Sequence, residues 1–493
     1  MANRSVANGN WALRTPIGGG QWLLLLAALG LSACAPSPET RAPVVEPARA
    51  PEPQQVLATE LARQTLSSVS RDHVIPVTAG ELQARFVRRL RDPISEGPWR
   101  GPLPETATPL NELLDEYQQR SPARPILPAV EVALEQVVRE LGTRSAYLNL
   151  ERVRAMDRWE TGADGAIGLL IRQMHHSYVI NEVLVGSPAE RSGLDRGDKL
   201  LAIDGESLDG LLLEEVIARL RGAAGSQVRL KVEFANGEQQ LLNLRREKLT
   251  LTPVEGRWLT RGIAYIRIRS LSQNSVEDFN RVFLGLLRKV GAPRGLVLDL
   301  RDNPGGLLDA ATELADTFLA RGPILQVQGR ADDDVIRMVA QPGSEVFEHK
   351  LPLAVLISDY TASGAEAIAA ALQDQRRAVI VGRSRSYADG LVHTIRPLPE
   401  RRLLKLATGM LYRASGGRIE DRGVVPDICM HQGTTRVVLR AEVAASKDTA
   451  CPYQEMSTPG EDESLLTVAV DLLADQDRYR QILQRGETGA ASR

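Results

Sequence analysis

One serine in the sequence stands where a nucleophile for acyl transfer would be expected. Ser363 follows the apolar run and turn of ISDYTA and begins SGAEAIAAALQD, so the pattern predicts a strand, a turn and a helix. A hydroxyl at the start of a helix can reach a bound carbonyl. Ser363 could also be only a helix cap, because Ser is a preferred residue at that position.

A second segment offers groups that could stabilise an oxyanion. Gly305 and Gly306 follow a buried strand predicted for residues 295–300 and precede the helical pattern LLDAATELADTFL. Two glycines between a strand and a helix leave backbone N–H groups free of side-chain cover. The two segments together predict a site for acyl-transfer chemistry.

The proton acceptor that such a serine needs is harder to assign. No lysine follows Ser363 before Lys405. His393 is a candidate base, with Asp389 to orient its ring, as in the Ser–His–Asp arrangements that recur on unrelated folds. His393 could instead be a strand residue that only hydrogen-bonds to a neighbour.

A separate block, residues 161–246, predicts a peptide-binding module. It runs through strands, the short helix of GSPAERSGL, the strand and turn of GDKLLAIDG, a longer helix and a closing strand. Its AIGL loop, Ala166 with the backbone N–H groups of Ile167, Gly168 and Leu169, could bind a terminal carboxylate while the peptide adds as an extra strand. The alternative is a groove that serves only as a spacer or is self-occluded.

The remaining chain divides by composition. Residues 35–55 predict a Pro-rich tether, residues 56–150 a helical cap region with a loop insertion, residues 251–430 an α/β core flanked by residues 141–160, and residues 431–493 a C-terminal extension with a helix. The net charge of −2 excludes a general attraction to nucleic acid. His175 and His176 predict an exposed hairpin rather than a metal site, and no metal or cofactor is expected.

Residues 1–34 predict a lipoprotein signal sequence. The apolar run of residues 22–31 is shorter than the roughly 20 residues that span a bilayer, and LSAC resembles the bacterial lipobox, which would leave Cys34 as a lipidated first residue. Ala35 after it favours, by the same resemblance, the periplasmic face of the outer membrane. An ordinary secretory signal with a chance cysteine is the alternative.

In an oxidising compartment the two other cysteines, Cys429 and Cys451, should form a disulfide, with two free buried thiols as the alternative.

Several motifs in order resemble the carboxyl-terminal processing serine peptidases of bacterial periplasms and chloroplast lumens. They are AIG, GSPAERSGL, GDKLLAIDG, LVLDLRDNPGG, SGAEAIAAALQD, RAVIVG and GVVPDI, and they cover about residues 141–428. The resemblance implies a crotonase-like ββα peptidase core with an inserted PDZ domain, within the α/β class. It places Ser363 on the nucleophile, Gly364 with Gly305 or Gly306 on the oxyanion hole, and Asp374 on an aspartate of the nucleophile helix.

The resemblance fails at the base. The family uses a Ser–Lys dyad, with a desolvated Lys in an F-G-K-G-T-V-Q loop, whereas this chain has SRSYADGLVH. Alignment puts Asp389 or Ala388 at the Lys position and His393 at the supporting Gln. Two functions therefore stay open: a peptidase rebuilt on His393, or a scaffold that captures protein C-termini without cutting them. The chain could work alone, as a homo-oligomer or with an active relative.

Overall fold

The computed structural model describes residues 53–91, 109–154, 164–343, 351–438, 451 and 459–484, apart from short gaps at 122, 175–176, 210, 212, 250–251, 332 and 432–433. The described residues all belong to one unit of the chain, Glu52–Arg493. Cys34, the tether up to residue 52, and His175 and His176 lie outside the described residues. Within the described part, no helix has the length and apolarity to cross a bilayer.

The first described elements are helices. They are α1 (Pro53–Asp72), α2 (Ala79–Arg91), α3 (Leu110–Arg120) and α4 (Ile126–Arg139). Apolar residues three and four apart on each helix form one buried cluster. Strand β1 (Ala146–Leu148) follows and pairs with β18 (Arg402–Arg413), which brings Leu404 and Leu406 into the same cluster. The N-terminal helices are therefore packed on a strand from the far end of the chain.

The next part is an antiparallel sheet. Its order is β3 (Leu169–Met174), β4 (Ser177–Val183), β5 (Lys199–Ile203), β8 (Gln227–Glu233) and β9 (Gln239–Arg245), and β6 (Glu206–Ser207) pairs with β5. The short pair β2 (Asp164–Gly165) and β7 (Gly222–Ala223) and the helices α6 (Pro188–Arg191) and α7 (Leu213–Leu220) complete it. Strand β3 is an edge strand with α7 beside it, so an extended peptide could add there.

The core is a seven-stranded sheet. Its order is β10 (Val254–Trp258), β11 (Ile263–Ile268), β12 (Gly295–Asp299), β15 (Leu353–Ile357), β16 (Val379–Gly382), β19 (Ile428–His431) and β20 (Thr434–Val437). The strands from β11 to β19 are parallel, and β10 and β20 are antiparallel to their neighbours. Parallel strands buried on both faces read as continuous apolar runs, which is how β12 and β15 appear in the sequence.

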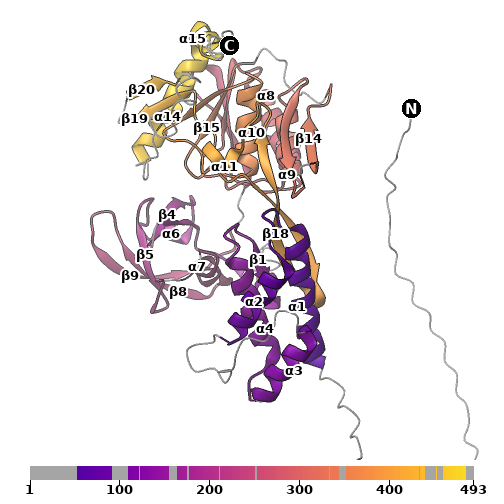
Figure 1. The fold of residues 1–493 in the computed structure, drawn as a ribbon. Helices are drawn as coiled ribbons and strands as arrows, with labels where there is room; N and C mark the ends of the chain where they lie inside the picture. Colours follow the sequence, from indigo (N-terminus) through magenta and orange to yellow (C-terminus); the bar gives the residue numbers. More distant parts are fainter. Residues whose placement is uncertain are drawn as a thin grey trace, which may run out of the picture. The chain divides into compact units, whose positions relative to one another are not determined.

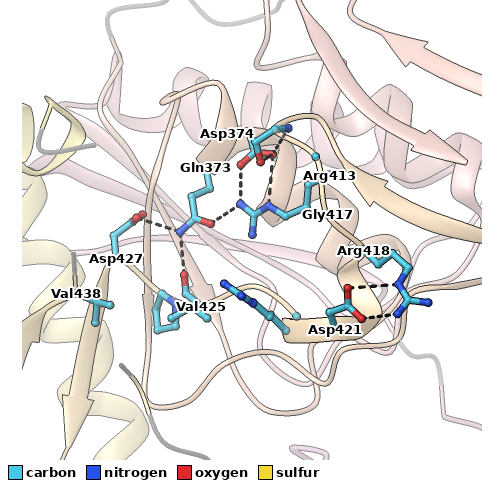
Figure 2. A pocket seen from close by; sticks show the side chains of 14 residues that line it. Gln373, Asp374, Arg413, Gly417, Arg418, Asp421, Val425, Asp427 and Val438 are labelled. Carbon is cyan, nitrogen blue, oxygen red and sulfur yellow. Dashed lines mark hydrogen bonds and ion pairs between the residues drawn. The ribbon is translucent and has the colours of Figure 1, made fainter. Parts of the chain in front are cut away.

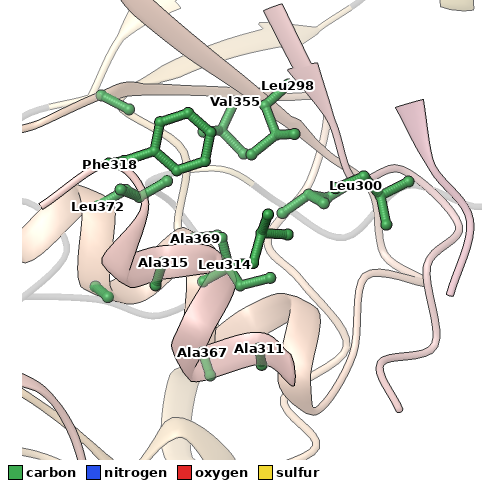
Figure 3. Close-up of a cluster of buried hydrophobic side chains, with 14 of the residues drawn as sticks. Leu298, Leu300, Ala311, Leu314, Ala315, Phe318, Val355, Ala367, Ala369 and Leu372 are labelled. Carbon is green, nitrogen blue, oxygen red and sulfur yellow. The ribbon is translucent and has the colours of Figure 1, made fainter. Parts of the chain in front are cut away.

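Helices cover both faces of this sheet. One face packs on α8 (Ser275–Val290), α9 (Leu308–Asp316) and α10 (Gly364–Asp374), and Figure 3 shows part of this cluster, with Leu298, Val355 and Phe318 in contact. The other face packs on α14 (Pro459–Ala474) and α15 (Gln476–Gln484). Successive side chains of a strand point to opposite faces of the sheet. On β12, Leu298 therefore lies in the first cluster and its neighbour Val297 in the second.

A second sheet connects the core to the N-terminal helices. It has the order β1, β18, β13 (Pro323–Gln328), β14 (Val335–Val339), and β17 (Leu391–Leu398) pairs with β18. The start of β18 pairs with β1, and both strands are labelled in Figure 1. The end of β18 pairs with β13. Short helical turns lie at η1 (Thr260–Gly262), η2 (Pro399–Arg401) and α11 (Ile419–Arg422). The long strand β18 thus ties the helical region to the part of the chain that carries Ser363.

Candidate active site

Ser363 lies on the tight turn between β15 and α10. Its backbone has φ 50° and ψ −119°, in the positive-φ region that a residue with a side chain rarely adopts. Such conformations persist where the surroundings hold them, and they concentrate at functional sites. The backbone N–H of Ser363 donates to the Glu366 carboxylate at 2.9 Å, which ties the turn to the first turn of α10.

The glycine loop lies against this turn. A Cβ atom on Gly305 would come within 2.8 Å of both the Ser363 Cβ and the Gly364 nitrogen, and one on Gly306 within 1.9 Å of the Leu271 carbonyl oxygen. Both glycines have positive φ, 91° and 144°. No larger residue fits at either position. The structure therefore brings together the serine and the three glycines expected at the site.

The hydrogen bonds distinguish between the two loop glycines. The N–H of Gly305 donates to the Asn303 side-chain oxygen at 2.8 Å, so it is already used. Among the described residues, the N–H groups of Gly306 and Gly364 have no acceptor. Two free amides beside a serine are the donors that an oxyanion requires, and Gly306 and Gly364 are placed to supply them.

Glu366 organises the loop opposite the serine. Its buried carboxylate accepts the N–H of Ser363, the N–H groups of Ala388 and Asp389 at 2.7 and 2.8 Å, and the Ser386 hydroxyl. Burial raises the pKa of Glu366 to about 7. The sequence carried one signal of this role, the S-x-x-E spacing of a capping box, but nothing in the sequence joined it to residues 386–389.

Asp389 lies next to the nucleophile turn. Its N–H and that of Ser363 donate to the same oxygen of Glu366, so the two backbones are within two hydrogen-bond lengths of each other. The Asp389 side chain is 9% exposed and forms an ion pair with Arg144, which comes from the segment between α4 and β1. The Arg144 guanidinium also lies over the Tyr387 ring, 5.2 Å from its centre. The acid at this position is therefore neutralised by a residue of the N-terminal region.

His393 faces the same N-terminal segment. Its Nε2 lies 2.8 Å from the Thr143 carbonyl oxygen, and a carbonyl only accepts, so Nε2 carries the proton. Burial lowers the pKa of His393, so the ring is neutral near pH 7. Among the described hydrogen bonds none joins His393 to Ser363 or to Asp389. The hydrogen-bonded Ser–His–Asp arrangement considered from the sequence is thus not formed, because His393 and Asp389 are each held by a different residue of the 143–144 pair.

Asp374 is at the opposite end of the nucleophile helix. Helix α10 has 11 residues, which separates its two ends by about 15 Å. Asp374 lines a pocket of about 330 Å³. It pairs with Arg413 (Figure 2), with 2.7 Å between the paired atoms, and it accepts the Ser415 hydroxyl at 2.9 Å. The structure does not bring Asp374 to Ser363; its contacts fasten the end of β18 to the helix.

The AIGL loop has the features of a carboxylate-binding loop. The N–H of Ala166 is used by Glu247, whereas those of Ile167 and Gly168 have no acceptor among the described residues. The Leu184 N–H donates to the Gly168 carbonyl, so Leu169 occupies the next, non-hydrogen-bonded position and its N–H points to the free edge of the sheet. Gly168 has φ 87°, and a Cβ atom there would meet Ser187 at 2.1 Å, so glycine is required.

This sheet also touches the turn that carries the serine. The buried side chain of Arg172, on β3, lies over the Tyr360 ring at 4.5 Å, three residues before Ser363. Glu182, on β4, accepts hydrogen bonds from Arg267 and Arg269 of the core. The edge strand β3 and the turn that carries Ser363 are therefore in direct contact through Arg172.

The cysteine pair expected from the sequence is bonded in the structure. The sulfur atoms of Cys429 and Cys451 are 1.99 Å apart, and both residues are buried. Cys429 belongs to β19, so the bond fastens the chain that leads to α14 to the core sheet.

Comparison with known proteins agrees with this geometry. Residues 262–430 match the family model described as peptidase family S41, and residues 179–233 match a PDZ domain. A carboxy-terminal-processing protease of Bartonella bacilliformis is 32% identical over 306 residues, covering 62% of this chain and 70% of the relative. A carboxyl-terminal-processing protease of Picosynechococcus sp. is 32% identical over 287 residues, covering 57% of this chain and 67% of the relative.

A solved structure supports the fold. The photosystem II D1 C-terminal processing protease aligns with a TM-score of 0.55 at 22% identity, over 81% of this chain and 99% of that one. The family resemblance and the fold class predicted from the sequence, an α/β peptidase core with a PDZ domain and N-terminal helices, are confirmed.

Proposed function

The chain belongs to the carboxy-terminal processing proteases of peptidase family S41, and on that premise we propose that it captures protein C-termini and cuts them slowly or not at all. The PDZ domain would bind the terminal carboxylate through the amides of Ile167, Gly168 and Leu169. The Ser363 site would keep its nucleophile and its oxyanion donors but lack an efficient base. The partners would be proteins with free C-termini.

One observation carries this proposal: Asp389 is paired with Arg144. Alignment with the family motif puts Asp389 or Ala388 at the Lys position, and neither side chain can do the work of a lysine. A Ser hydroxyl is a weak nucleophile until a neighbouring group accepts its proton. A carboxylate held by a guanidinium is a poor acceptor, and Arg144 itself cannot give up a proton. General-base help is typically worth about 10²- to 10⁴-fold in rate, so its loss leaves weak residual hydrolysis.

The competing function is a peptidase that uses His393 as its base. It is supported by one detail, because a neutral ring with its proton on Nε2 leaves Nδ1 free to accept a proton. The two functions differ in the activity of the unmodified protein. A rebuilt peptidase cleaves readily, and its rate rises with pH as the histidine loses its proton.

A single comparison separates the two. Hydrolysis of an unstructured, fluorescence-quenched polypeptide is measured for the wild type, Ser363→Ala and His393→Gln. We expect very weak wild-type turnover that Ser363→Ala abolishes and that His393→Gln leaves unchanged. Robust cleavage that both substitutions abolish would refute the proposal and establish the rebuilt peptidase.

Peptide capture is tested separately from hydrolysis. Because backbone amides should hold the carboxylate, a peptide with a free apolar C-terminus should bind more tightly than the same peptide with a C-terminal amide. Titration calorimetry on Ser363→Ala avoids any cleavage. Equal affinity for the two peptides would count against PDZ-type recognition.

We also propose that the chain is anchored at the periplasmic face of the outer membrane through a lipid on Cys34. The support is the sequence alone: the short apolar run, the small residues and the cysteine stand in the order of a lipobox. Labelling with a fatty-acid analogue in a bacterial host should mark the wild type and not Cys34→Ser. Equal labelling of both proteins would exclude this anchor.

A further inference from the structure

The segment Gly142–Ser145, between α4 and β1, is the part of the N-terminal region that reaches the Ser363 site. Gly142 and Arg144 have positive φ, 68° and 53°. For a residue with a side chain, as at Arg144, that conformation costs free energy and is kept only where neighbours hold it. The contacts that hold this segment therefore also hold the Arg144 guanidinium on Asp389.

The first anchor is His73, just after α1. Its Nδ1 lies 2.7 Å from the Ile75 carbonyl oxygen, and its Nε2 lies 2.8 Å from the Thr143 hydroxyl. A carbonyl only accepts, so Nδ1 carries the proton of the neutral ring and Nε2 accepts from Thr143.

The rest of this chain of hydrogen bonds then has one direction. The Ser145 hydroxyl accepts the Ala407 N–H at 3.0 Å and donates to the Thr143 oxygen at 2.9 Å. Since the Thr143 hydroxyl already donates to His73, it can only accept from Ser145. The hydrogen bonds therefore run from the Ala407 N–H through Ser145 and Thr143 to Nε2 of His73. This direction requires a neutral His73, because a protonated Nε2 cannot accept.

The second anchor is His393, which donates from Nε2 to the Thr143 carbonyl oxygen. Thr143 is thus hydrogen-bonded by two histidines: by His73, after α1, through its hydroxyl, and by His393, on β17, through its backbone carbonyl. The adjacent residue is Arg144. We propose that residues 142–145 are an acid-released latch that fixes the N-terminal helices to the Ser363 site, with His73 and His393 as its proton-sensitive anchors.

The charges around the two rings favour release on protonation. Arg330 acts on His73, and Lys405 and Arg144 act on His393, each disfavouring a cationic ring. The Ile75 carbonyl at His73, and the Thr143 carbonyl and Asp389 carboxylate at His393, act in the opposite direction but do not outweigh burial and the cations, because the pKa of each ring is lowered. Asp72, the residue before His73, is paired with Arg71 and Arg396. Adding a proton to either ring therefore places a cation beside cations.

Burial is the largest of these effects on both rings. It lowers the pKa of both histidines in the latched state, whereas a released histidine has a pKa near 6.5. Above about pH 6.5 both states are neutral and the latch is unaffected. As the pH falls below that value the released state takes up the protons, so release is favoured by up to about tenfold per histidine per pH unit, until the latched pKa is reached.

The test measures backbone hydrogen exchange in the full chain, purified in mild detergent, at about pH 7.5 and about pH 5. Exchange rates are corrected for the intrinsic effect of pH, and peptides covering residues 140–147 and 386–392 are compared with one from α8. In the wild type we expect acid to reduce the protection of the first two peptides by at least about tenfold relative to α8. His73→Gln together with His393→Gln should remove this acid effect.

Further variants test whether the acid response comes from the two histidines of the latch. His431→Gln, on β19, changes a histidine outside the segment and should leave the acid response intact. Arg144→Met should expose residues 386–392 at both pH values without affecting α8. If the double substitution unfolds the protein, His393→Gln alone is measured instead. It should remove one of the two histidine contributions, so the fold-loss of protection on going to about pH 5 should fall to about the square root of the wild-type value. An unchanged acid response in the histidine variants, or no acid response in the wild type, overturns the latch; neither outcome depends on whether the protein hydrolyses peptides.

Discussion

Replacing Asp389 by Lys should restore hydrolysis if only the proton acceptor has been lost. A lysine is a base only when its pKa is lowered enough for a neutral amine to exist near pH 7. Position 389 supplies both causes of such a shift, because the side chain there is 9% exposed and the Arg144 guanidinium is its neighbour. The N–H of residue 389 shares an oxygen of Glu366 with the N–H of Ser363, so the new amine would start beside the nucleophile.

The expected gain is about 10²- to 10⁴-fold in kcat, which is what general-base assistance is typically worth. The substitution also costs stability, because each unit by which burial and Arg144 lower the pKa of the lysine costs about 1.4 kcal/mol near pH 7, whereas Arg144, 47% exposed, can be solvated when it loses its partner. The assay is turnover of the quenched polypeptide at saturating substrate. Turnover should rise with pH as the lysine loses its proton.

Three variants make the result interpretable. Asp389→Lys combined with Ser363→Ala must lose the gain, since the lysine acts through the serine. Ala388→Lys tests the neighbouring position, whose φ of 68° disfavours any side chain. Asp389→Met removes the acid without supplying a base and should stay inactive. If neither lysine variant exceeds its Ser363→Ala control, the reasoning that only the base is missing is refuted.

Three further predictions concern stability. Because burial raises the pKa of Glu366 to about 7, its contribution is full below the unfolded value of about 4.5 and is lost as the pH rises to 7, on the order of 3 kcal/mol; urea unfolding should show this fall in the wild type and not in Glu366→Gln. Gly306→Ala should destabilise by more than about 3 kcal/mol, whereas Gly285→Ala, in an open helical position, should stabilise by about 0.5 to 1 kcal/mol; equal effects in thermal unfolding would contradict the packing argument. Reducing the Cys429–Cys451 bond should cost about 3 kcal/mol, and two alkylated thiols in the unreduced protein would exclude the bond.

Much of the fold could be predicted because its signals are local. The buried runs of β12 and β15, each followed by a turn and an apolar-periodic helix, identify parallel strands and place Ser363 and the glycine pair at neighbouring strand ends. The AIGL loop could likewise be recognised, since a glycine of positive φ at the head of an edge strand is a feature of a few adjacent residues. Helix geometry alone also separates Asp374 from Ser363, because both belong to one helix of known rise.

The state of the site depended on contacts between distant residues. His393 meets Thr143 across 250 positions, and Asp389 meets Arg144, so the partners that occupy the candidate base and its acid come from a part of the chain with no catalytic motif. Local spacing also could not decide between Gly305 and Gly306, because the choice depends on which amide the Asn303 side chain occupies. The sequence by itself determined which residues could act, since their types and spacing are local properties. Only the tertiary structure decided which of them are free to act, since hydrogen bonds and ion pairs between remote segments hold the proton acceptors and leave the oxyanion donors open.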